Sequence, residues 1–115
     1  MGFERLRVYQ ASQQLDAEVR RLMARIPRGH ADDVNHLGRS GGSLLYNIPE
    51  AYGAESTGKK RNHLAIARGE ADEVRSVLRR LVAKGCLTER DIRRACELTS
   101  VIAKMLTAWI ARLPD

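Results

Sequence analysis

Residues 43–69 read SLLYNIPEAYGAESTGKKRNHLAIARG, and no other stretch departs so far from the sequence of an ordinary helical protein. The first half is apolar but contains Pro49 and Gly53, and glycine and proline cost a helix roughly 1 and 3 kcal/mol relative to alanine. The second half turns through residues 56–58 into a strongly basic segment. The pattern predicts a helix on each side of this turn, with Ser56 as the N-cap of the second helix.

Outward from this turn, apolar residues recur at alternating intervals of three and four residues, which is typical of helices that bury one face. Four such segments with short connections predict an all-α fold, an antiparallel up-down-up-down four-helix bundle, in a single domain over residues 1–115. The predicted buried seams are Val8, Ser12, Leu15, Val19, Leu22 and Ile26; Val34, Leu37, Gly41, Leu44, Ile48 and Ala51; Leu64, Ala67, Ala71, Val74, Leu78 and Leu81; and Ile92, Ala95, Thr99, Ile102, Leu106, Trp109 and Leu113.

Local signals set the expected ends of these helices. The first is predicted from Glu4 to Ile26, followed by Pro27, and the third is predicted to stop at Gly85. The small residues at 38 and 40–43 give the second helix a thin middle, which would let another helix approach closely. Pro49 predicts a kink or local loosening there, and a break near Ile48 is the alternative. A Thr88 cap with Asp91 three residues later predicts the start of the fourth helix.

Amino-acid composition narrows the possible fold and function classes. An aromatic content of 4% disfavours β-sandwiches and barrels. The net charge of +6 attracts polyanions such as nucleic acid, although the excess of arginine, 16 of 20 basic residues, is also what a GC-rich coding sequence produces. No leader and no apolar run near 18 residues are apparent, so we expect a cytoplasmic protein without a membrane span. Cys86 and Cys96 are expected to be reduced structural residues.

No set of residues in the sequence forms a recognisable catalytic motif. GxSxG, HExxH, the phosphate-cradling GxxxxGK[ST] loop and the paired ExxH carboxylates of di-iron bundles are all missing. The histidines His30, His36 and His63 share no helical ligand spacing and are interpreted as surface or capping residues. We therefore expect no enzyme activity, no cofactor and no metal.

Basic residues concentrate on the third predicted helix. Arg61, Arg68, Arg75 and Arg79 are spaced by seven, seven and four residues, so they share roughly one face. This face is a candidate phosphate-binding ridge, and the ordinary solvated side of an amphipathic helix is the alternative. The candidate nucleic-acid-binding residues are Lys59, Lys60, Arg61, Arg68, Arg75 and Arg79.

Two further groups of residues leave alternatives open. A buried Asn47, with Glu50 and Tyr52 beside it, is interpreted as fixing the register between helices, and a binding pocket is the alternative. The fourth helix carries a second apolar stripe, which indicates either a subunit interface or a wide core face. The members of this stripe are Leu98, Val101, Met105 and Ala108.

The run Asn47–Gly53, then Ser56, then residues 64–69 (LAIARG) resembles a known family. These are the bacterial four-helix-bundle proteins named for open reading frames in 23S ribosomal RNA intervening sequences, whose pattern is roughly S-I-P-S-N-I-A-E-G-Y-G, a loop with serine, and then I-A-x-G-S. The similarity extends over nearly the whole chain. Pro49 stands where alanine is usual, and Ala51 replaces a glycine. The family-motif residues with an expected structural role are Asn47, Glu50, Tyr52, Gly53 and Gly69.

The resemblance implies a cytoplasmic bundle that assembles into a ring-like homo-oligomer, expected to be a pentamer, without known catalysis. A similar bundle is found in the accessory protein of diversity-generating retroelements, a basic pentameric barrel that engages nucleic acid and a reverse transcriptase. The leading hypothesis is therefore a non-enzymatic homo-oligomer that binds RNA or another nucleic acid through an arginine-rich surface. The alternative is an oligomeric protein-binding adaptor, and an enzyme acting on a small ligand comes third.

Overall fold

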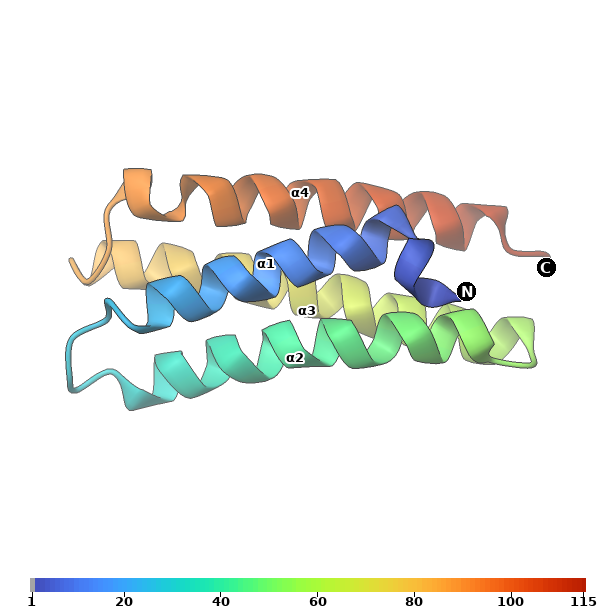
Figure 1. Cartoon of the computed structure of the whole chain (residues 1–115), viewed down its shortest axis with the longest axis horizontal. Helices are drawn as coiled ribbons and strands as arrows, with labels where there is room; N and C mark the ends of the chain where they lie inside the picture. Colours follow the sequence, from blue (N-terminus) through green and yellow to red (C-terminus); the bar gives the residue numbers. More distant parts are fainter. Residues whose placement is uncertain (1) are drawn as a thin grey trace.

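A computed structural model describes residues 2–115. Four α-helices follow a short 3₁₀ turn, η1 (Phe3–Arg5): α1 (Arg7–Met23), α2 (Ala31–Gly53), α3 (Thr57–Ala83) and α4 (Glu89–Arg112). Successive helices run in opposite directions along a molecule of 45 × 25 × 21 Å, and both chain ends lie at the end that holds the α2–α3 turn (Figure 1). This is the predicted all-α, antiparallel up-down-up-down bundle.

Each helix packs against its neighbours in the chain, and α1 also packs against α4. Within residues 2–115 the backbones of the diagonal pairs, α1 with α3 and α2 with α4, do not approach each other closely. The seams predicted from periodicity form the core: all the predicted leucines of the first three helices, together with Ile92 and Ile102, are fully or almost fully buried. Val34, Ile26, Trp109 and Leu113 lie at the margin and are only partly buried.

The first helix is shorter than predicted at both ends. Leu6 has an extended backbone (φ −67°, ψ 129°), so α1 begins at Arg7 rather than Glu4. An edge-to-face contact between the rings of Phe3 and Tyr9, with centroids 4.9 Å apart, holds the preceding 3₁₀ turn against α1. At the other end, i→i−3 bonds from the Arg25 and Ile26 amides close a tighter last turn after Met23.

The second helix runs unbroken through Pro49, so the alternative of a break near Ile48 is wrong. Its thin middle does allow close approach, as predicted. A Cβ added at Gly41 would lie 2.9 Å from Asp16 Oδ1 of α1, and one added at Gly38 would lie 3.3 Å from Met23 Cε. The absence of side chains at these two positions therefore makes room for side chains of α1.

The predicted caps are confirmed. Ser56 Oγ accepts a hydrogen bond from the Lys59 amide, and Thr88 forms a reciprocal capping box with Asp91. After α3, Gly85 has φ +79°, and the Cys86 amide donates to the Leu81 carbonyl at 2.9 Å. This is the Schellman arrangement, which explains why a glycine stands at the stop of the helix.

Asp33 lies in the first turn of α2, at the contact between α2 and α3. Its side chain is buried, and it accepts hydrogen bonds from Arg80 Nε at 3.1 Å and Lys84 Nζ at 2.8 Å, both on α3. The bond from Lys84, with a further contribution from Arg80, lowers the pKa of Asp33 below its usual value. The carboxylate therefore ties the first turn of α2 to the last turns of α3.

Candidate nucleic-acid interface

The four arginines predicted to share one face lie along the boundary between α3 and α4. Arg61 donates to the Pro114 carbonyl at 3.2 Å, Arg68 to Thr107 Oγ1 at 3.3 Å, and Arg75 to Ser100 Oγ at 2.8 Å. Each step of seven residues along α3 is matched by a step of seven in the opposite direction, from Pro114, just beyond α4, to Thr107 and Ser100 on α4. We call Arg61, Arg68, Arg75 and Arg79 the arginine row.

The row is anchored on one side and open on the other. Each of the four side chains is at least partly exposed. A guanidinium group carries five N–H donors in a planar fork, so a single bond to a hydroxyl or carbonyl leaves several donors for another acceptor. A heptad step along a helix is about 10 Å, so the row from Arg61 to Arg79 extends for about 27 Å.

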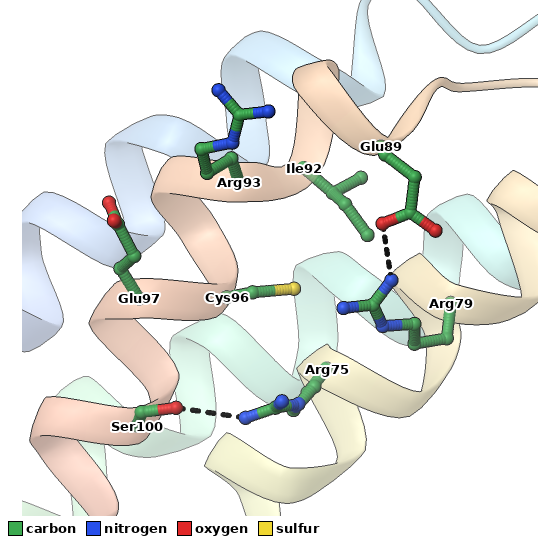
Figure 2. Close-up of a pocket in the computed structure, with 8 residues that line it drawn as sticks. All are labelled: Arg75, Arg79, Glu89, Ile92, Arg93, Cys96, Glu97 and Ser100. Carbon is green, nitrogen blue, oxygen red and sulfur yellow. Dashed lines mark hydrogen bonds and ion pairs between the residues drawn. The ribbon is translucent and has the colours of Figure 1, made fainter.

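The row ends in a shallow pocket of about 290 Å³ between α3 and α4 (Figure 2). Arg79 forms an ion pair with Glu89 at the edge of this pocket, and Arg75 lies one turn away, bonded to Ser100. Cys96 lies between them on α4 and is buried. Burial raises the pKa of the Cys96 thiol, so this cysteine stays protonated.

The two predicted lysines do not continue the row. Lys60 Nζ donates to the carbonyls of Ala51 and Tyr52 at 3.1 Å each, which satisfies free acceptors at the last turn of α2. Lys59 is exposed and lines a separate surface pocket with Glu50, Glu55 and His63. The structure therefore groups the four arginines of the prediction and separates both lysines from them.

The partners of the arginines on α4 were not anticipated from the sequence. Thr107 and Ser100 are seven residues apart, as are Arg68 and Arg75, and this shared spacing is the signal that could have found them. Arg93 also lines the pocket and extends away from Arg75 and Arg79, and among the described residues it makes no hydrogen bond or ion pair (Figure 2). It adds a further cation beside the row.

Asn47 occupies the contact between α2 and α3. Its side chain is almost fully buried, and its amide nitrogen donates to the carbonyl and hydroxyl of Ser43 at 3.0 Å each. Since the Ser43 carbonyl can only accept, Asn47 Oδ1 faces His63 Nδ1, 2.9 Å away, and accepts a hydrogen bond from its N–H group. The amide therefore bridges two helices and has most of its hydrogen-bonding capacity used within the chain.

The chain matches a family model along most of its length. The model is that of the 23S rRNA-intervening sequence protein, and it matches residues 4–108. The chain belongs to this family. A crystal structure of a protein of unknown function from the S23 ribosomal protein family of Bacteroides thetaiotaomicron VPI-5482 superimposes with a TM-score of 0.82. The two are 26% identical over 90% of this chain and 97% of the other. No curated protein matches the chain.

The other motif residues lie at the surface. Glu50, Tyr52 and Gly53 are exposed in the last turns of α2, and Gly69 is exposed on α3. A Cβ added at Gly53 or Gly69 would meet nothing within 4 Å, so neither glycine is required for packing inside one chain. Their structural role stays a prediction, and in a single chain only Asn47 of this group is buried.

The second stripe of α4 divides between the core and the surface. Leu98 is buried, as expected for a wide core face, whereas Val101 is 42% exposed and Met105 and Ala108 are half-buried. Met105 and Ala108 line a groove of about 700 Å³ between the start of α1, the end of α2 and α4, together with Trp109. Arg7, Lys104 and Arg112 also line it. The exposed part of the stripe therefore borders an apolar groove that carries positive charge.

Two further properties bear on function. Among residues 2–115, no group of three or more His, Cys, Asp or Glu side chains is arranged to hold a metal ion. His36 pairs with Glu73 at 2.9 Å and His63 with Asn47, so these two histidines have partners within the bundle. In the described part of the chain, no helix combines the length and apolar character that a membrane span requires.

Proposed function

We propose that this protein is a non-catalytic, cytoplasmic homo-oligomer that binds RNA or another nucleic acid through the phosphates of the nucleic acid. The observation that carries the proposal is the arginine row. Its four guanidinium groups lie along one helix boundary, and their partners on α4 hold them in place. Planar guanidinium forks suit bidentate contacts with phosphate oxygens, and pre-positioned side chains lose less entropy on binding.

The test is binding of nuclease-treated protein to a labelled structured RNA at about 50 and 200 mM salt. If the row neutralises four phosphates, affinity is expected to fall by about 150-fold over this range, using the slope for double helices. Replacing Arg75 and Arg79 with glutamate is expected to weaken binding strongly and to reduce the salt slope by about two, one for each arginine lost. Unchanged affinity in this variant would exclude the row as the binding surface.

A matched control separates the row from net charge. Arg28 and Arg39 are exposed, Arg28 in the α1–α2 loop and Arg39 on α2, which lies diagonally across the bundle from α4. The control variant replaces Arg28 and Arg39 with glutamate. Like the Arg75 and Arg79 variant, it changes the net charge from +6 to +2, because each replacement of arginine by glutamate lowers the charge by two. Equal losses of affinity in the two variants would mean that overall charge, and not the row, attracts the RNA.

A second candidate function is that of a protein-binding adaptor, and the groove beside Trp109 is the observation that favours it. Its apolar lining, from Leu6, Val8, Met105 and Trp109, is partly open to solvent. Capture of one stoichiometric protein by the nuclease-treated chain, with no RNA binding at the lower salt concentration, would favour the adaptor. Substitution of Trp109 by alanine would then be expected to release that protein.

A further inference from the structure

The end of the bundle opposite the chain termini holds the α1–α2 and α3–α4 loops side by side (Figure 1). Cys86, in the second loop, and His30, in the first, contact each other there, with Sγ 3.3 Å from Nε2. They are 56 residues apart in sequence, so only the fold brings them together. Neither residue belongs to the arginine row or to the groove beside Trp109.

Both side chains are held by the ends of helices. Cys86 follows Gly85 in the Schellman turn, and its amide is bonded to the Leu81 carbonyl, which fixes its backbone. His30 is the residue before α2, and its side chain makes no capping bond to its own helix. The imidazole is therefore available to the thiol of Cys86.

The pair is accessible, in contrast to the other cysteine of the chain. Cys86 and His30 are both partly exposed, and His30 lines a surface pocket of about 410 Å³ with Asp32, Asp33 and Lys84. Asp33 is already bonded to Lys84 and Arg80, so the charged groups of this pocket largely satisfy one another. Cys96 is buried, and burial raises the pKa of its thiol.

We propose that Cys86 is a modification site, a thiol that attacks small disulfides while His30 takes up its proton. The Cys86 sulfur forms a bond to one sulfur of the disulfide, the disulfide bond breaks, and its electron pair leaves on the second sulfur as a thiolate. As the sulfur attacks, the proton of Cys86 passes to His30 Nε2, which lies 3.3 Å from Sγ. A thiolate beside an imidazole is the arrangement that makes a cysteine nucleophilic.

The experiment treats the full chain with oxidised glutathione and locates the mixed disulfide by peptide mass mapping. A single adduct on Cys86 is expected. Replacing His30 with alanine is expected to slow the reaction about threefold to tenfold, because the Cys86 thiol loses the nearby base that takes up its proton.

Controls distinguish a chemical role of His30 from a structural one. His30→Gln keeps a polar side chain but cannot accept the proton, so it should react as slowly as His30→Ala while retaining wild-type helical circular dichroism. Wild-type rates in both His30 variants would overturn the proposal. An adduct on Cys96 at a comparable rate, or none on Cys86, would overturn it as well.

Discussion

At the scale of single residues, Gly41 and Gly42 differ only in what faces them. An added Cβ at Gly41 would lie 2.9 Å from Asp16 Oδ1, whereas one at Gly42 would meet nothing within 4 Å. We expect Gly42→Ala to stabilise the bundle by about 0.5–1 kcal/mol through lower backbone entropy in the unfolded chain. Gly41→Ala should stabilise the bundle less, or destabilise it, because the Asp16 side chain must move to make room for the added methyl group.

Chemical denaturation of the two variants measures this difference. Asp16 pairs with Arg20 through Oδ2, and its buried Oδ1 has no hydrogen-bond partner in the described part of the chain. In an Asp16→Ala background the obstruction is gone, so Gly41→Ala should recover the stabilisation seen for Gly42→Ala. Equal effects of the two alanines in the wild-type background would show that Asp16 does not limit the approach of α1 to α2.

At the scale of helices, Asp33 connects α2 to α3 through a charged contact that depends on pH. Its pKa is lowered in the folded chain, chiefly by the bond from Lys84. The folded state therefore binds this proton less readily than the unfolded state does. The contribution of Asp33 to stability is complete above its ordinary pKa of 3.8 and is lost as the pH falls through the lower, folded value.

Replacing Asp33 with asparagine tests this linkage. The variant should lose about 1–2 kcal/mol of unfolding free energy at pH 7, since a hydrogen-bonded charge facing two cations is removed. The difference from wild type should shrink as the pH approaches 2. Other carboxylates with lowered pKa values, Glu18 and Asp91, titrate in both proteins, so the difference isolates Asp33. A difference that does not change with pH would contradict the assignment.

At the scale of the whole molecule, the exposed part of the α4 stripe is the proposed contact between subunits. We expect Val101→Lys to convert the expected pentamer into folded monomers, because it puts a charge into an apolar interface. Ile66 on α3 is also 42% exposed, so Ile66→Lys is a matched control that should leave the assembly intact. Sedimentation or light scattering gives the molecular mass; assembly retained by Val101→Lys would place the interface elsewhere.

The helices and their caps were predictable because they depend on residues that are close in sequence. The seams follow from intervals of three and four, and the Thr88 box and the Gly85 stop each lie within a few residues. The late start of α1 was missed because it depends on an extended Leu6 and on the contact between Phe3 and Tyr9. The capping patterns of a single helix contain no signal for either.

Only the α3 side of the candidate site was predictable from the sequence. Heptad spacing placed four arginines on one face of α3, but it carried no information on which helix that face adjoins. The sequence also did not predict three kinds of contact: the bonds from the row to α4, the bond from Lys60 to the end of α2, and the bonds from α3 to the buried Asp33. Each of them joins residues that are distant in sequence or lie on opposite sides of a turn. Such pairings depend on the packing of whole helices against one another.

The matched heptad steps of α3 and α4 also limit how the bundle can change in length. One inserted residue turns the following part of a helix by about 100°, which would move Arg75 away from Ser100, whereas seven residues return it to within about 20°. Insertions of seven residues in every helix would keep the seams aligned and lengthen the molecule by about 10 Å. Each inserted heptad could carry one more arginine, so the arginine row can be lengthened only in steps of seven residues.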